Sequence, residues 1–259
     1  MRAIWKGAIN FGLVNIPVRL YAATEKEALD FHLLSKKDHS RIRYKRVSEA
    51  TGKEVPADQI IKGYELENGE YITITDEELQ DASPEKSSSI DIQEFVDERE
   101  IPTLFFERPY YLEPDKSAAK PYLLLRDALA KSGKVGIAQF VLRNREHLCA
   151  LKPQDEVLVL NAMRFADEIR SPVELKIPSQ NKATTKEVDL ALRLIEDMSG
   201  KFEPEKYKDT FTEDVKKMID AKAKGEKITA PAKPESTGKV VDLMAALQES
   251  LKKPKRRAA

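Results

Sequence analysis

Three basic side chains alternate along one short segment of the chain. Arg41, Arg43 and Lys45 occur in the run RIRYKR, where Ile42 and Tyr44 separate them. In a β-strand the three would share one face, about 6.6–6.8 Å apart, which is roughly twice the ~3.4 Å axial spacing of phosphates along a DNA strand. This spacing suits a phosphate backbone. It also suits a solvated edge strand whose charges prevent aggregation.

Further basic residues surround this run or occur in a later turn. Arg143 and Arg145 flank the turn in LRNREHL, where they either reach a nucleic-acid groove or are ordinary surface residues. Ten residues are candidates for DNA contact. They are Arg41, Arg43 and Lys45, the two arginines of the later turn, and Lys36, Lys37, Arg46, Lys53 and Lys62.

The sequence contains no convincing catalytic motif. Gly7 and Gly12 have the outer spacing of a phosphate-binding loop, but Leu13 and Val14 stand where Lys and Ser/Thr would contact phosphate and Mg²⁺. We therefore expect no nucleotide hydrolysis.

The histidines and the single cysteine also fail to form a catalytic or metal pattern. His32, His39 and His147 are spread along the chain without an HExxH motif. His147 and Cys149 share one face of an expected strand, where packing explains them better than nucleophilic chemistry. One cysteine excludes an intramolecular disulfide and thiolate-rich zinc sites. We predict a non-enzymatic protein that needs no cofactor and holds no metal.

Four carboxylates offer an alternative function. Asp91, Glu94, Asp97 and Glu98 are hard ligands of the kind that hold Mg²⁺ in nucleases, although runs of charge are usually solvated faces. A metal-dependent DNA-processing enzyme is therefore one alternative to a DNA-binding protein. A protein-only scaffold is the other.

The formal net charge of zero conceals strong segregation along the 259 residues. Residues 63–115 contain 16 acidic and 3 basic side chains, whereas the sequence before and after them has a basic excess. An acidic outer surface would repel DNA and leave an inner basic surface preferred, or it could simply promote solubility. No stretch reaches the ~18 apolar residues that span a bilayer, and the first residues lack an apolar signal region, so we expect a cytoplasmic protein.

Short β-branched and aromatic runs predict a barrel or sandwich with a few added helices. Capping boxes begin helices at Thr75 and Thr184, Gly133 ends a helix that starts near Ser117, and an Asn-Gly turn lies within residues 67–71. The expected strands are 3–10, 17–22, 41–47, 70–74, 89–96, 103–112, and three more between 134 and 161.

After residue 178 the apolar period becomes helical. Val188, Ala191, Ile195 and Met198 line one face of an expected helix from Thr184 to Gly200, and we predict that this face packs across a partner subunit.

A second helical run is expected at 212–224, followed by a Pro- and Lys-containing linker at 226–238. The final segment, 239–259, contains VVDLMAALQESL and a short basic tail. Val241, Met244, Ala245 and Leu251 lie near helical spacing there and predict docking into a groove of a partner protein.

Several motifs in fixed order resemble the bacterial Ku family. They include RAIWKGAINFGLVNIPVRLY, RIRYKRV, RPYYLEP, KVGIAQFVLRNREHLCALKP and FADEIR, and the resemblance resumes at VVDLMAALQESL. It implies a β-barrel core with an inserted bridge that encircles DNA (1–178) and a helical dimerisation arm (179–225). It also implies a ligase-recruiting helix (239–259) after the linker.

The function that the resemblance implies is non-homologous end joining of double-strand breaks. A homodimeric ring would bind double-stranded DNA ends without sequence specificity and recruit an ATP-dependent DNA ligase, associated with the nucleoid when DNA-bound. The long Lys-rich extension of some family members is absent from this sequence, which ends in KKPKRRAA.

Overall fold

The chain is divided into two compact units. The computed structural model describes residues 1–25, 29–82, 88–178, 183–226, 247–248 and 250. The first unit comprises Met1–Glu27 and Phe31–Ser171, and the second comprises Ala28–Asp30 and Pro172–Ala259.

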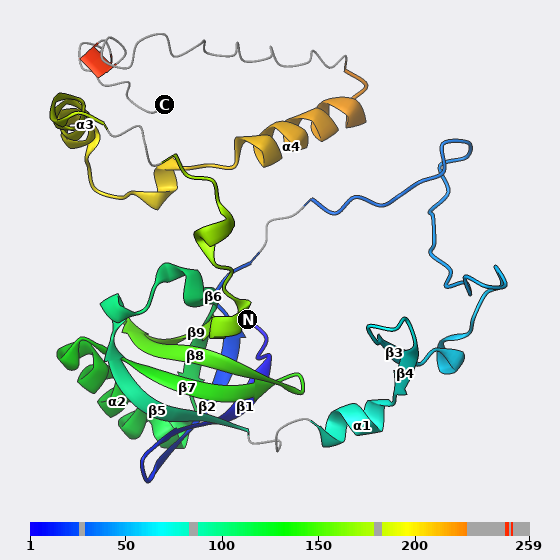
Figure 1. Ribbon diagram of the computed structural model, residues 1–259, viewed down its shortest axis with the longest axis horizontal. Helices are drawn as coiled ribbons and strands as arrows, with labels where there is room; N and C mark the ends of the chain where they lie inside the picture. The colour runs from blue at the N-terminus through cyan, green and yellow to red at the C-terminus, as the bar shows by residue number, and fades with distance from the viewer. Residues whose placement is uncertain (26–28, 83–87, 179–182, 227–246, 249, 251–259) are drawn as a thin grey trace. The chain divides into compact units, whose positions relative to one another are not determined.

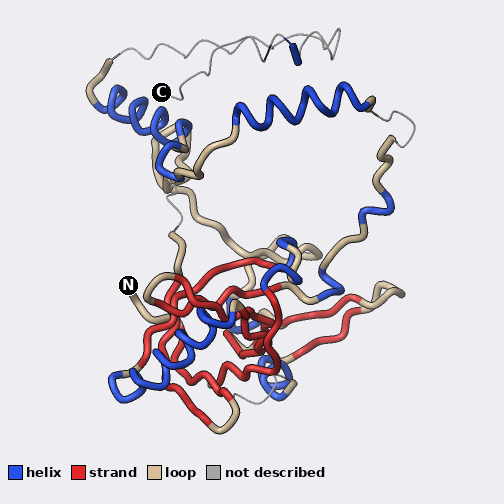
Figure 2. The backbone as a smooth tube through the Cα atoms, turned by 90° about the vertical axis from the view of Figure 1, so that its left-hand side faces the viewer, coloured by secondary structure: helices blue, strands red, loops and turns tan. Residues whose placement is uncertain are grey.

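The first unit contains a closed β-barrel in which all neighbouring strands but one pair are antiparallel (Figures 1 and 2). Its strands follow one another around the barrel in the order β1-β2-β6-β9-β8-β7-β5. Their bounds are β1 Trp5–Phe11, β2 Val14–Ala22, β5 Ser89–Asp97, β6 Phe106–Pro114, β7 Lys134–Leu142, β8 Arg145–Gln154 and β9 Val157–Met163. The predicted mainly β fold with added helices is therefore confirmed.

The barrel closes where β1 meets β5, in a parallel pairing that aligns Ile9 with Ile90. At this seam the Asn10 amide donates a hydrogen bond to Asp91, at 2.6 Å between Nδ2 and Oδ1. The backbone must approach closely, because a Cβ added to Gly7 would lie 2.1 Å from the Ser88 carbonyl oxygen and 2.2 Å from the Trp5 ring. Only glycine fits this position without a shift of the backbone.

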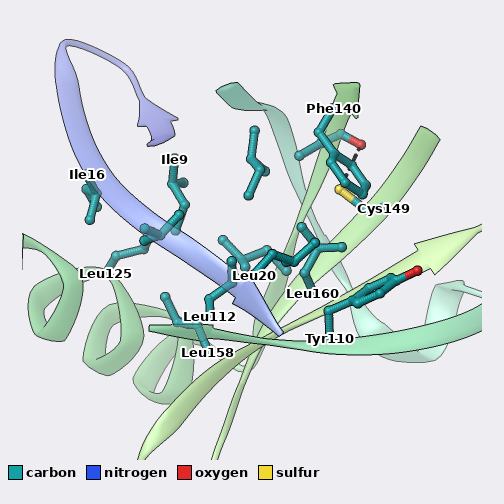
Figure 3. Packing of buried hydrophobic residues seen from close by; sticks show 14 of the residues in the cluster. Ile9, Ile16, Leu20, Tyr110, Leu112, Leu125, Phe140, Cys149, Leu158 and Leu160 are labelled. Atoms are coloured by element: carbon teal, nitrogen blue, oxygen red, sulfur yellow. Dashed lines mark hydrogen bonds between the residues drawn. The ribbon is translucent and has the colours of Figure 1, made fainter. Parts of the chain in front are cut away.

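Alternate residues of each strand fill the barrel, as the two-residue period of a strand requires (Figure 3). On β2, for example, Ile16, Val18 and Leu20 are buried, whereas the residues between them are only partly covered. The alternation turns a modest number of apolar residues into one continuous core.

Helix α2, Ala119–Ser132, contacts β2, β7 and β8. Because β2 is not a neighbour of β7 or β8 in the barrel order, a helix that contacts all three lies across one end of the barrel. Tyr122 anchors it there: the hydroxyl donates to the Leu112 carbonyl and accepts from the Leu158 N–H, both at 2.7 Å. These two backbone groups belong to the pair with which the described β6–β9 register ends.

A long insertion joins β2 to β5. It contains strands β3 Lys62–Glu65 and β4 Tyr71–Ile74, which pair with each other, and helix α1 Asp76–Asp81. The short 3-10 helices of the first unit are η1 Ala57–Gln59, η2 Glu98–Glu100, η3 Thr103–Phe105, η4 Lys116–Ala118 and η5 Ala166–Glu168.

The second unit is helical in its described part. Its main helices are α3 Thr185–Met198 and α4 Thr210–Ala223, with 3-10 turns η6 Pro172–Glu174 and η7 Pro204–Lys206. Both predicted capping boxes are present, at Thr75 with Glu78 and at Thr184 with Glu187. Backbone hydrogen bonds to these carboxylates lower the pKa of Glu78 and of Glu187.

Most predicted elements are confirmed with shifted ends, but the strand predicted at residues 41–47 is wrong. Residues 41–47 form no ladder strand, because only Arg41 and Val47 make isolated bridges and the residues between them have no strand partner. Residues 103–105 form a 3-10 turn instead of the start of β6. The C-terminal glycine stop of α2 is confirmed, with Gly133 at φ 64°.

Replacing Tyr122 with Phe should lower the free energy of unfolding by about 1–3 kcal/mol, because two buried backbone groups lose their partner. Urea unfolding measures the change. Tyr111→Phe is the matched control, since it removes a hydroxyl from a half-buried tyrosine of the same barrel region, and it should shift stability by less than about 0.5 kcal/mol. Equal effects of the two substitutions would contradict the anchoring role of Tyr122.

Candidate nucleic-acid interface

The insertion between β2 and β5 consists largely of three successive hairpins. In the first, Leu34 bridges Arg41, and the Ser35 N–H donates to the Ser40 carbonyl at 2.9 Å. The second pairs Val47 with Glu54 in the same manner. The third is formed by β3 and β4.

Each hairpin turns through one residue with positive φ. These residues are His39 at 56°, Gly52 at 64° and Gly69 at 82°. A left-handed residue near the end of a three- or four-residue loop lets the two arms pair with short connections. The predicted turn at Asn68-Gly69 is thereby confirmed, and the other two hairpins were not predicted.

None of the described residues from 29 to 82 is buried. Large apolar side chains such as Phe31, Tyr44 and Ile61 are instead exposed, Tyr44 by 85%. The described part of the insertion therefore has no buried core, and its hairpins present these apolar side chains on a surface that a partner could cover.

The three basic residues of RIRYKR do not form the regular ladder that their spacing predicted. Arg41 and Arg43 line a shallow pocket of about 410 Å³ with Phe31, His32 and Tyr44. Lys45 instead pairs with Glu54, at 2.6 Å between Nζ and Oε2. The three side chains therefore do not share one strand face. Two arginines line a pocket with aromatic residues, and the lysine is in an exposed ion pair.

The other basic residues in the described part of the insertion are all exposed. Lys36 and Lys37 lie in the loop of the first hairpin, and Arg46 and Lys53 belong to the second. Lys62, at the start of β3, pairs with Asp76 at 2.7 Å. The insertion thus gathers eight of the ten candidate DNA-contacting residues on one stretch of hairpins.

The remaining two candidates belong to the barrel. Arg143 and Asn144 form the turn between β7 and β8, both with positive φ, as a two-residue hairpin turn requires. Arg145 pairs with Glu168 at 3.3 Å. The side chains of Arg143 and Arg145 are exposed at this turn.

Three of the four carboxylates of the nuclease alternative, Asp91, Glu94, Asp97 and Glu98, have separate structural partners. Asp91 accepts from Asn10 and Ser89, Asp97 caps a 3-10 turn, and Glu98 pairs with Lys152. Within the described part of the chain, no three His, Cys, Asp or Glu side chains are grouped as metal ligands. The arrangement therefore gives no support to a metal-dependent reaction at these residues.

Cys149 and His147 are packing residues, as the sequence indicated. Cys149 is fully buried, its thiol lies 3.3 Å from the Ala138 carbonyl oxygen, and burial raises the pKa of the thiol. The His147 ring lies against Phe140, with 5.5 Å between ring centroids. A buried, protonated thiol is a poor nucleophile.

Helix α3 presents the predicted apolar face. Val188, Ile195 and Met198 are exposed, Ile195 by 61%, and Ala191 is half-buried. Leu192, which was not among the predicted residues, lies four residues after Val188 and is also exposed. The same helical spacing could have found it. The ligase-binding candidates Val241, Met244, Ala245 and Leu251 lie outside the described residues.

Taken together, these features define a class of protein: a closed seven-stranded barrel, interrupted by an insertion whose described residues form no buried core and include eight candidate basic residues, and followed by helices. No helix in the described ranges has the length and apolarity to cross a membrane. Comparison with known proteins identifies the family.

The Ku70/Ku80 beta-barrel domain matches residues 10–190. Proteins named "Non-homologous end joining protein Ku" are 46% identical in Anaeromyxobacter sp. and 44% in Opitutus terrae, covering 99% and 97% of this chain and 87% and 91% of the relatives. In Pseudomonas aeruginosa, such a protein is 42% identical over 97% of this chain and 88% of its own length. The chain belongs to the Ku family.

Proposed function

We propose that this chain forms a homodimeric ring that binds double-stranded DNA ends in non-homologous end joining and recruits an ATP-dependent ligase. The observation that carries the proposal is the insertion. It is attached at both ends to a closed barrel, buries none of its described residues and exposes eight candidate basic residues. An attached loop of chain that exposes these Lys and Arg side chains suits a bridge around a duplex.

Binding through phosphates suits a protein that must accept any broken end. Lys and Arg contacts to the backbone supply affinity without reading base sequence. Arg41 and Arg43 are the strongest candidates, because Lys45 and Lys62 have acidic partners within the insertion. Lys36 and Lys37, at a hairpin loop, extend the same surface.

Dimerisation is supported by the apolar side chains that are exposed among the described residues. The exposed side chains of α3 form one stripe, and the hairpins expose Phe31 and Tyr44. Exposed apolar patches of this kind mark protein interfaces. A second copy of the chain would cover them and complete a ring, with residues 179–225 as the dimerisation arm.

No catalytic step is part of the proposal. The ring would act by threading onto an end, holding the backbone through dispersed contacts and presenting residues 239–259 to the ligase. The chain would need no cofactor and would work on DNA in the cytoplasm, at the nucleoid.

The first test compares linear with closed-circular DNA as competitors for binding to a labelled duplex. Linear DNA should compete far better, because a ring can enter only at an end. The logarithm of the affinity should also fall with the logarithm of salt concentration by about 0.9 per neutralised phosphate. Equal competition by closed-circular DNA would contradict the ring proposal. Absence of DNA binding would favour a protein-only scaffold. Mg²⁺-dependent cleavage would instead favour the enzyme.

Replacing Arg41 and Arg43 together with Gln should weaken DNA binding and flatten its salt dependence by about 0.9 per lost contact. The matched control is the double replacement of Lys45 and Lys62 with Gln. It removes the same charge from residues that already have acidic partners, and it should have the smaller effect. Fluorescence anisotropy at several salt concentrations measures both. A larger effect of the control would reverse the assignment.

Replacing Ile195 with Asp should convert the dimer to monomer, because burying an unpaired carboxylate in an interface is strongly unfavourable. Arg193→Asp places the same side chain on the opposite face of α3 and should leave the dimer intact. Light scattering at micromolar concentration distinguishes the two. A monomeric wild-type chain would refute the dimer itself.

Truncation after Gly238 should preserve binding to linear DNA but abolish stimulation of the cognate ligase. Some affinity for DNA should be lost with the Lys and Arg residues of KKPKRR. A nick-sealing assay with and without the truncated chain measures the effect. Full stimulation would refute ligase recruitment by this segment and leave the ring unaffected.

A further inference from the structure

A pocket of about 430 Å³ lies in the first unit, where β6 begins and β9 ends, and we call it the arginine pocket. Its walls come from the two 3-10 turns η3 and η5 and from the residues next to them. The sequence did not mark any of these residues as a candidate for DNA contact. They are Thr103, Leu104, Arg164, Glu168, Ile169 and Arg170.

The guanidinium of Arg164 is fixed by backbone carbonyl groups. Its Nη1 donates to the carbonyl oxygens of Leu104 at 3.0 Å and of Phe106 at 2.8 Å. The backbone N–H of Arg164 also donates to the Phe105 carbonyl at 2.8 Å. A side chain that is already held in place loses less conformational freedom when it binds a ligand.

The donors of Arg164 that remain suit an oxyanion. Its Nε and Nη2 have no partner among the described residues. These two nitrogens form one edge of the planar guanidinium, and their N–H groups can donate in parallel to two oxygens of one phosphate or carboxylate. Arg170 is exposed, also has no partner in the described ranges, and brings a second guanidinium to the same pocket.

The arginine pocket keeps an excess of positive charge although Glu168 lines it. One carboxylate oxygen of Glu168 accepts from the Phe165 N–H at 2.8 Å, and the other pairs with Arg145 at 3.3 Å. Arg145 therefore offsets the charge of Glu168. The same ion pair joins the pocket to the turn between β7 and β8, where Arg143 is also exposed.

We propose that Arg164 and Arg170 bind one backbone phosphate of DNA, which gives the barrel a phosphate contact separate from the insertion. A duplex suits the site better than a single protein carboxylate does, because its successive phosphates can meet the pocket and the arginines of the β7–β8 turn together. The inference rests on the proposed binding of DNA but not on the ring, since a duplex that touches the barrel from any direction of entry could place a phosphate there.

Replacing Arg170 with Gln should weaken the binding of a linear duplex about tenfold, as expected for loss of a charge-assisted hydrogen bond. It should also flatten the salt dependence by about 0.9. Two duplexes of different sequence should lose affinity equally, because a phosphate contact reads no bases. Arg108→Gln is the matched control: Arg108 is an exposed arginine of β6 that does not line the pocket, so its effect should be smaller. Fluorescence anisotropy at several salt concentrations measures both variants.

The fork of Arg164 is tested by replacing it with Lys. Lysine keeps the charge but has no pair of parallel N–H groups, so the affinity for DNA should fall although the net charge is unchanged. Arg170→Lys should retain more affinity than Arg170→Gln, because it restores the charge at an exposed position. Urea unfolding checks that the variants are folded. If Arg164→Lys is not folded, Arg170→Gln decides the proposal by itself.

Equal effects of Arg170→Gln and Arg108→Gln would overturn the arginine pocket, and a preference of the wild-type chain for linear DNA would still support the ring. Equal competition by closed-circular DNA, together with the expected loss in Arg170→Gln, would contradict the ring and support the pocket. If Arg170→Gln leaves DNA affinity unchanged and dissociates the dimer in light scattering, the pocket binds a protein carboxylate and the proposal is wrong.

Discussion

The parallel pairing of β1 with β5 is the contact on which the rest of the structure depends. It closes the barrel, and it also fixes both ends of the insertion, because β5 begins where the insertion ends and β2, which precedes the insertion, is the other neighbour of β1. The close approach at Gly7 and the Asn10–Asp91 hydrogen bond both serve this seam. The closed barrel thus fixes the two ends of an insertion whose described residues form no buried core.

The insertion and α3 share one physical property, which is apolar surface that the described chain leaves exposed. Local hydrogen bonds shape the hairpins, and capping boxes shape the helices, but neither kind of interaction buries much area. The barrel has a buried apolar core, whereas the described residues of the insertion and of α3 have none. In the proposed ring, a second subunit would bury these apolar side chains. Dimerisation would then also order the surface that contacts DNA.

Local signals made much of the fold predictable from sequence. The alternation of Ile16, Val18 and Leu20 marks a strand, and the capping box at Thr184 marks a helix start, because each pattern acts through neighbours a few residues away. The RIRYKR run misled for the same reason: alternation alone cannot reveal that residues 42–46 lack a strand partner. The ion pair of Lys62 with Asp76 depends on how the hairpin of β3 and β4 folds, so no sequence pattern predicted it.

The barrel seam joins residues that are far apart in the chain, since Asn10 and Asp91 are separated by 81 positions. Closing such a long loop costs entropy that grows only with the logarithm of its length, so halving or doubling the insertion would change the cost by only about 0.6 kcal/mol. The barrel is therefore nearly indifferent to how much chain it carries between β2 and β5. The length of the insertion could therefore change during evolution with almost no effect on the stability of the barrel.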